Sequence, residues 1–204
     1  GYFTGGRTGV DVEGTFDADA PRYLASDIPW DQLTHINYAY AHVDADNKVS
    51  VGSPLETNAS IGMEWPGVEG AEMDPEYSYK GHFNLLNKYK KQHPHVKTLI
   101  AIGGRAETGG YFADNGERIA SGGFYTMTTN SDNTINHAAI NAFADSVVDF
   151  LRLYGFDGAS IDYEIPSTMQ DAGNPLDFKF SNALATGMSA SYDVLMKTLR
   201  EKLD

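Results

Sequence analysis

Residues 153–166 read Leu-Tyr-Gly-Phe-Asp-Gly-Ala-Ser-Ile-Asp-Tyr-Glu-Ile-Pro, and the rest of the chain is best understood outward from them. Gly155 and Gly158 indicate a turn, and residues 159–165 then predict a short strand. The strand ends at Pro166, because proline has no N–H to donate to a strand ladder. The sequence therefore predicts one strand here, with polar side chains at alternate positions.

Three polar side chains share one face of this strand. Residues two apart in a strand point the same way, so Ser160, Asp162 and Glu164 lie together. At a separation of roughly 6–7 Å and an effective dielectric near 20, the two carboxylates repel by about 2–3 kcal/mol. That repulsion favours a state in which one of them holds a proton, as a general acid must. An edge strand with its polar face in water explains the same periodicity.

The composition indicates a globular protein and narrows its partners. The chain has 204 residues, 41% of them hydrophobic, which is enough for one ordinary domain with a good core. Its net charge of −13 disfavours nucleic acid and anionic membranes as partners and is compatible with a neutral or cationic ligand. The absence of cysteine excludes disulfides and thiol chemistry.

Targeting and membrane signals are not apparent in the sequence. No apolar run approaches the roughly 20 residues that cross a bilayer. The chain begins directly in Gly1-Tyr2-Phe3, so we expect any leader to have been removed or to lie outside it.

Strands alternate with helices along the chain. The predicted strands cover residues 1–4, 34–43, 96–102 and 159–165. The predicted helices cover residues 77–92 and 136–154, with Gly155 as C-terminal cap, and a final stretch from Tyr192 to Leu203. Long loops are predicted over residues 44–76 and 105–134.

This alternation of strands and helices is typical of a parallel sheet or barrel. Binding residues should then lie at the carboxyl ends of the strands. Glu164, the pair Gly103-Gly104 and Val43 all fall at such ends.

The acidic strand resembles the active-site strand of the chitinases of glycoside hydrolase family 18, whose pattern is Asp-x-x-Asp-x-Asp-x-Glu. Asp157, Asp162 and Glu164 match that pattern, and Gly158 is in its usual place. Ser160 stands where the family has its middle Asp.

Three further segments resemble the family in the same order. Gly1-Tyr2-Phe3 is similar to the first barrel strand, in which the aromatic lies beneath the sugar, and residues 33–41 are similar to the second. Residues 97–104 are similar to the third strand, which usually ends Ser-x-Gly-Gly, and Ala101 replaces that Ser. The resemblance implies substrate contacts from Tyr2, Tyr40, Gly103 and Gly104. Trp65 lies in the loop over residues 44–76, and an aromatic there is suited to stacking on a sugar ring.

The resemblance also implies a fold, a (β/α)8 TIM barrel within the α/β class. Such a barrel needs about 250 residues, so residues 1–204 are expected to form its N-terminal half, strands one to four with their helices. The remainder must come from the same chain or a second one.

The mechanism that the resemblance implies is substrate-assisted retaining hydrolysis. Glu164 is the expected general acid, and Asp162 is expected to orient the 2-acetamido group of the substrate, which acts as the nucleophile. Asp157 and Gly158 are expected to be structural. Ser160 and Ala101 both differ from the family pattern, which suggests that the hydrogen bonds at the base of the site are rearranged. No cofactor and no metal are expected.

The expected function is therefore hydrolysis of chitin, a polymer of β-1,4-linked N-acetylglucosamine, by a secreted or extracellular protein. A non-catalytic chitin-binding lectin of the same fold is the alternative, favoured by Ser160, Ala101 and loop aromatics. A scaffold subunit of a larger assembly is a third hypothesis, and an enzyme that cleaves the chitobiose core of glycoproteins shares the acidic motif.

Several smaller motifs carry weaker signals. Aromatic side chains at Tyr111, Phe112, Phe124 and Tyr125 lie in the second long loop, where such residues either stack on sugars or anchor the loop. His93-Pro94-His95 lacks acidic neighbours at ligand spacing. Residues 44–48 predict a turn rather than a calcium loop. Asn58-Ala59-Ser60 is a formal glycosylation site.

Overall fold

The computed structural model describes residues 1–10, 15, 17, 20–104, 109–119, 121–164 and 177–204, with the backbone alone for residues 177–188. Among these residues, no helix is both long and apolar enough to cross a bilayer. Contacts divide the chain into two compact units. Unit 1 comprises Gly1–Ala39 and Val51–Leu99, and unit 2 comprises Tyr40–Ser50 and Ile100–Asp204.

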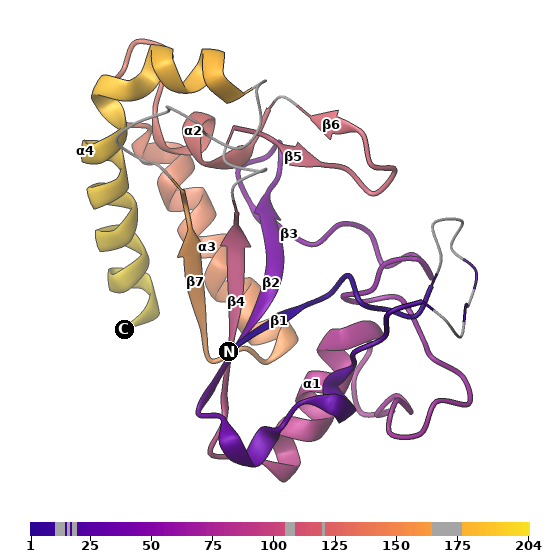
Figure 1. Cartoon of the computed structure of the whole chain (residues 1–204). Helices are drawn as coiled ribbons and strands as arrows, with labels where there is room; N and C mark the ends of the chain where they lie inside the picture. The colour runs from indigo at the N-terminus through magenta and orange to yellow at the C-terminus, as the bar shows by residue number, and fades with distance from the viewer. Residues whose placement is uncertain (11–14, 16, 18–19, 105–108, 120, 165–176) are drawn as a thin grey trace. The chain divides into compact units, whose positions relative to one another are not determined.

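Four strands follow one another in the main sheet in the order of the sequence. They are β1 (Tyr2–Thr4), β2 (His35–Val43), β4 (Lys97–Gly103) and β7 (Gly158–Asp162). β1 and β2 are parallel, and the arrows of β2, β4 and β7 point the same way in Figure 1. An order that never reverses is typical of a barrel, whereas a doubly wound sheet changes direction at a switch point. Strands are confirmed in the predicted segments 1–4, 34–43 and 96–102, whereas the strand predicted over residues 159–165 ends at Asp162, before Glu164.

Helices and short elements complete the chain. The helices are α1 (Gly81–Gln92), α2 (Gly123–Thr128), α3 (His137–Tyr154) and α4 (Asp177–Leu203), with 3-10 turns η1 (Ala25–Asp27) and η2 (Trp30–Gln32). The short strand β3 (Val49–Ser50) pairs antiparallel with β2, and β5 (Tyr111–Phe112) forms a hairpin with β6 (Arg118–Ile119). β2 and β4 each pass through both units.

The core of unit 1 is aromatic. The Tyr38 ring lies edge-on to Phe83 of α1 at 4.9 Å and to Phe3 of β1 at 5.7 Å between ring centroids. The buried Trp30 ring stacks on Tyr89 of α1 and on His93, the residue that follows this helix. Aromatic packing therefore fixes α1 against β1 and β2 within this unit.

The core of unit 2 is built on the apolar stripe of α3. Ile140, Phe143 and Val147 on this stripe are fully buried, as the helical spacing predicts. The helix begins after Asn136, whose side chain accepts a hydrogen bond from the N–H of Ala139. It ends at Gly155, which has a left-handed φ of 71°. The predicted helix and its C-terminal cap are confirmed.

Four further details differ from the sequence predictions. The first helix begins at Gly81 rather than at residue 77, because Gly81 has φ +68° and a Cβ there would lie 2.5 Å from the Ser60 carbonyl oxygen. The predicted loop over residues 44–76 contains β3. The predicted loop over residues 105–134 contains β5, β6 and α2. The final helix begins at Asp177, well before Tyr192.

Candidate active site

The acid pair lies at the carboxyl end of β7. Asp162 is the last residue of that strand, Glu164 follows two residues later, and both are half-buried. Tyr163 between them is only 6% exposed, and its ring contacts Phe124 of α2 and Tyr192 of α4. Because neighbouring residues of an extended chain point to opposite faces, the two acids face away from these helices.

Two glycines at the end of β4 hold the main chain of Asp162. The N–H of Gly104 donates a hydrogen bond to the Asp162 carbonyl oxygen at 2.9 Å. Gly103 has φ +107°, and a Cβ there would lie 2.6 Å from the same oxygen. Both the backbone conformation and the close approach exclude a side chain at position 103. The Gly103-Gly104 pair therefore sets where the acidic strand ends.

Tyr40 joins this arrangement from β2. Its side chain is 46% exposed, and its ring lies 3.5 Å from the place that a Cβ of Gly104 would occupy. A ring that is open to solvent and backed by a glycine offers a flat apolar surface, on which a pyranose can stack. The structure thus brings Tyr40, Gly104 and Asp162 together within unit 2.

The two altered motif positions lie on neighbouring strands. Ala101 of β4 is fully buried, and Ser160 of β7 is half-buried. Neither side chain carries a charge, so Asp162 and Glu164 are the only carboxylic acids of β7 and the two residues that follow it. Asp157, which precedes β7, is exposed, and Gly158 begins the strand. Asp157 is therefore at the far end of the strand from the acid pair.

Two predicted sugar-binding residues lie in unit 1. Tyr2 of β1 is 61% exposed and presents its ring to solvent. Trp65 is only 2% exposed: its ring packs on His82 at 4.8 Å, and its indole N–H donates to the carbonyl oxygen of Thr8. A buried ring has no face for a sugar, so Trp65 belongs to the core of unit 1 and is left out of the proposed site.

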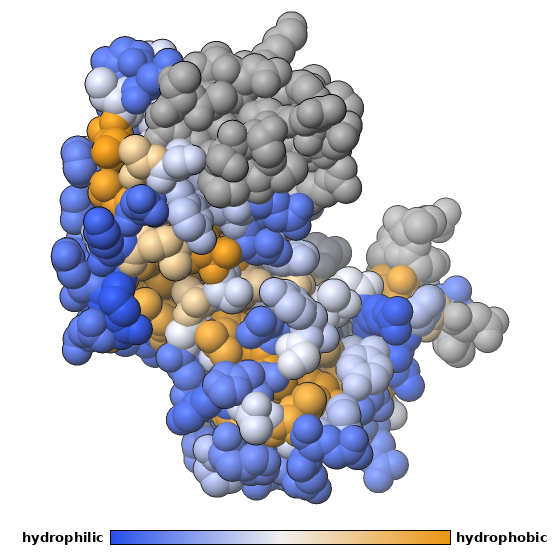
Figure 2. All heavy atoms as spheres, turned by 60° about the vertical axis from the view of Figure 1, so that its left-hand side comes forward, coloured by the Kyte–Doolittle hydropathy of each residue, from blue (hydrophilic) through white to orange (hydrophobic). Residues whose placement is uncertain are grey.

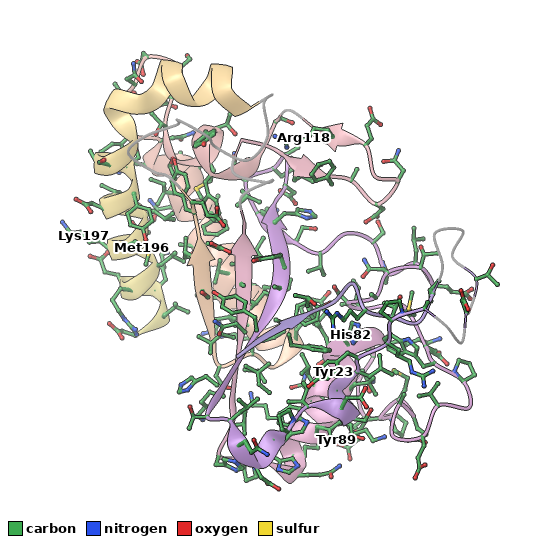
Figure 3. All side chains as sticks on the ribbon, in the orientation of Figure 1. Tyr23, His82, Tyr89, Arg118, Met196 and Lys197 are labelled. Atoms are coloured by element: carbon green, nitrogen blue, oxygen red, sulfur yellow. The ribbon has the colours of Figure 1, made fainter. Side chains whose placement is uncertain are left out.

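The loop aromatics of unit 2 likewise include both buried and exposed rings. Phe124 and Tyr125 are fully buried in α2 and pack against Tyr163, which corrects the hypothesis that they stack on sugars. Tyr111 stacks on His42 of β2 at 4.7 Å, and burial lowers the pKa of that histidine. Phe112 is 39% exposed beside Arg118, labelled in Figure 3.

The weaker motifs have structural explanations. Asp44 closes the turn between β2 and β3, because its carboxylate accepts from the N–H groups of Asp46 and Lys48. The Asn58 amide donates to the carbonyl oxygens of Val51 and Ser53, so the sequon side chain is engaged in its own loop.

The histidine motif also packs within its unit. The ring of His93 stacks on Trp30, and its Nδ1 lies 3.2 Å from the Asp31 carboxylate. The part of the chain that the structure describes holds no group of three His, Cys, Asp or Glu side chains suited to a metal ion.

Sequence reasoning missed the packing of Phe124 on Tyr163. The ring centroids are 4.9 Å apart and the planes are nearly parallel, at 11°. The alternation of residues 159–165 already indicated that Tyr163 faces away from the acids. Nothing in the loop sequence identified Phe124 as its partner, because a six-residue helix has too little periodicity to recognise.

Comparison with known proteins gives one consistent family. A profile of the family described as Glycosyl hydrolases family 18 matches residues 2–204. Chitinase A1 of Niallia circulans is 28% identical over 204 residues, covering 89% of this chain and 25% of that protein. Probable chitinase 2 of Drosophila melanogaster is 29% identical over 171 residues, covering 84% of this chain and 26% of that protein.

A solved structure agrees closely with the fold. A family GH18 chitinase from Chromobacterium violaceum superposes with a TM-score of 0.91 at 59% sequence identity. The match covers 99% of this chain and 29% of that one. The chain therefore spans about a quarter of the length of the curated relatives that it matches.

Proposed function

The chain belongs to glycosyl hydrolases family 18, and from that premise we propose that it carries the catalytic strand of a chitin-hydrolysing glycosidase. The observation that carries the proposal is the pair Asp162 and Glu164 at the carboxyl end of β7, with the main chain of Asp162 held by Gly104. A pure binder has no use for a carboxylic acid beside a scissile bond. The proposed substrate is β-1,4-linked N-acetylglucosamine.

The proposed reaction is substrate-assisted hydrolysis with retention of configuration. Glu164 donates its proton to the glycosidic oxygen as the bond to the anomeric carbon breaks. The carbonyl oxygen of the substrate's 2-acetamido group attacks that carbon, and Asp162 orients the group and stabilises its developing positive charge. Water, deprotonated by Glu164, then opens the cyclic intermediate and restores the acid.

Sugar binding is assigned to the exposed aromatic rings and the glycine pair. In unit 2, Tyr40 offers an open ring for stacking, and Gly104 keeps the surface beside it flat; in unit 1, Tyr2 offers an open ring of its own. Asp157 and Gly158 shape the start of β7. The proposed ligands are therefore chitin and its oligosaccharides, and since that polymer lies outside cells, we place the protein there too.

We further propose that residues 1–204 form the N-terminal half of a TIM barrel, completed by the same chain or a second one. β7 is the terminal strand of the described sheet, and all five of its residues are half-buried. Figure 2 shows apolar residues at the molecular surface on the side of α4. A strand edge and apolar surface of this kind are normally covered by further strands and helices.

One specific observation favours a second function, a chitin-binding lectin of the same fold. Ser160 and Ala101 remove a carboxyl and a hydroxyl relative to the family pattern, and both lie on the strands that carry the site. A protein of this family that has lost catalysis would still bind sugar through Tyr40 but would show no turnover. Binding without hydrolysis would support that function.

The stereochemistry of the product tests the proposed mechanism. The intact protein, given a tetramer of N-acetylglucosamine, should release product whose new reducing end is initially the β-anomer by proton NMR. The matched N-deacetylated tetramer should not be cleaved, because it lacks the acetamido oxygen. An initial α-anomer, or equal cleavage of both tetramers, would contradict the substrate-assisted step.

A further inference from the structure

The residue between the two acids is packed against helices α2 and α4. Tyr163 lies between Asp162 and Glu164, and its ring is enclosed by Phe124 at 4.9 Å, Tyr125 at 5.8 Å and Tyr192 at 5.8 Å. Phe124 and Tyr125 come from α2, and Tyr192 comes from α4. Two separate helices therefore meet on the single residue that joins the acids.

Ring packing is the main interaction of Tyr163. Within the described residues its hydroxyl is buried and makes no hydrogen bond. Burial raises the pKa of this hydroxyl, so it stays neutral. The neighbouring Thr128 hydroxyl donates instead to the Phe124 carbonyl oxygen, at 2.6 Å. An unpaired buried hydroxyl is unfavourable, so the contacts that hold this residue are those of its aromatic ring.

Phe124 also touches the other strand of the site. A Cβ on Gly103 would lie 2.4 Å from Cε2 of Phe124, and 2.6 Å from the carbonyl oxygen of Asp162. The Phe124 ring therefore lies against both the glycine end of β4 and the Tyr163 ring. Because Gly104 is hydrogen-bonded to Asp162, Phe124 is connected to the acidic strand both through the end of β4 and through Tyr163.

The helix that supplies Phe124 is itself anchored. Gly122 precedes α2 with φ +79°, and a Cβ there would lie 2.5 Å from the carbonyl oxygen of Asp44. At the other end, the Thr129 hydroxyl donates to Ser191 of α4 at 2.7 Å, and both side chains are buried. A helix of six residues has little stability of its own, so these contacts are what fix the position of Phe124.

We propose that Tyr163 is a positioning residue for the acid pair, acting through its ring stack on Phe124. The inference rests on the proposed function. The stack sets the direction of the Asp162–Glu164 main chain, and hence where the two carboxyl groups meet the glycosidic bond. Displacement of catalytic groups by about 1 Å can lower a rate by about 100-fold.

The test compares ring-removing and ring-keeping variants of the intact protein on a tetramer of N-acetylglucosamine. Phe124→Leu and Tyr163→Leu should lower kcat by about 10- to 100-fold with KM within about twofold, since the sugar-binding rings are untouched. Tyr163→Phe keeps the ring and removes only the unpaired hydroxyl. It should retain kcat within about twofold and should not lower Tm.

Phe150→Leu is the matched control for lost core volume. Phe150 is nearly buried on α3, where it packs on Tyr154 and Phe156 rather than on Tyr163. It should lower Tm as Phe124→Leu does and leave kcat unchanged, which separates positioning from stability.

The outcomes separate the inference from the proposed function. A native protein that hydrolyses the tetramer, with kcat unchanged in Phe124→Leu and Tyr163→Leu, overturns the inference alone. Equal loss of kcat in Phe150→Leu also overturns it, because the effect would then follow stability. Absence of turnover in the native protein overturns the proposed function, and the inference with it.

Discussion

Ser160 occupies the position at which this chain departs from the acidic pattern of its family. It lies two residues before Asp162 on the same strand, and its side chain carries no charge. A carboxylate at this position would add negative charge beside the acid pair, and would keep Glu164 protonated to higher pH. The serine therefore weakens the electrostatic support of the acid.

Ser160→Asp tests that role directly. Hydrolysis of a tetramer of N-acetylglucosamine should become about tenfold faster, and the pH optimum should move upward. Adding Ala101→Ser should increase the gain, because a hydroxyl on the neighbouring strand can hydrogen-bond the new carboxylate. A pH–rate profile that matches the native one in both height and position would count against this account of Ser160.

His82 shows what a single buried side chain does to stability. It projects from α1, where Figure 3 labels it, and its ring contacts Phe3 at 5.0 Å and Trp65 at 4.8 Å. Its Nε2 lies 3.3 Å from the Gly5 carbonyl oxygen, and its Nδ1 has no hydrogen-bond partner among the described residues. Burial lowers the pKa of His82 from 6.5 to about 4.

The lowered pKa of His82 makes the stability of the fold depend on pH. Between pH 6.5 and about 4 the unfolded chain binds a proton that the folded chain rejects, so stability is fully present above pH 6.5 and falls as the pH drops toward 4. The loss is on the order of 3 kcal/mol. Replacing the ring with a non-titrating amide removes this part of the acid sensitivity.

Urea unfolding at pH 7 and at pH 4.5 measures the stability that His82 costs at low pH. The native free energy of unfolding should fall more steeply between the two pH values than that of His82→Gln, which keeps a donor for Gly5. Parallel losses in the two proteins would mean that His82 is protonated as readily in the folded state as in the unfolded one.

At the scale of elements, the parts that the sequence predicts are those whose residues repeat with a clear period. The apolar stripe of α3 and its cap at Gly155 were predictable, because both depend on local spacing. The strands β2 and β4 are continuous runs of β-forming residues bounded by turn signals. Tertiary contacts did not have to be known for any of these.

The elements that were missed depend on contacts distant in sequence. The start of α1 is set by the Ser60 carbonyl oxygen, which leaves room only for a glycine at position 81. The hairpin β5–β6 has two residues in each strand and is fastened by Tyr111 on His42. α2 is placed by Asp44 and Ser191. Such short elements have no periodic pattern of their own.

The candidate site was likewise predictable only where local sequence determines it. The acids and the glycine pair were predicted from their positions at strand ends, and Tyr40 was predicted from the resemblance to the family. The structure brings Tyr40, Gly104 and Asp162 together. The sugar-binding role predicted for Trp65 does not fit its burial. The composition of a loop does not show which way a side chain faces. The Trp65 ring is held inward by His82 and by a hydrogen bond to Thr8.

At the scale of the whole molecule, the order of the strands is the most informative feature. β1, β2, β4 and β7 follow one another in the sheet in the order of the sequence, and the chain matches the family from residue 2 to residue 204. Because the strands run in the same direction, their carboxyl ends lie at one end of the sheet, where a TIM barrel carries its active site. The fold alone does not establish the chemistry, which depends on the acid at the end of β7.

Hydrolysis of N-acetylglucosamine oligosaccharides by the intact protein, compared with Glu164→Gln, tests the central claim most directly. The account predicts measurable turnover in the native protein and a loss of at least about 1000-fold in the variant. Oligosaccharide binding should be retained in the variant, because its side chain has nearly the same size and the sugar-binding rings are unchanged. Equal turnover in both proteins, or binding without turnover in the native protein, would contradict the claim that Glu164 is the general acid of a glycosidase.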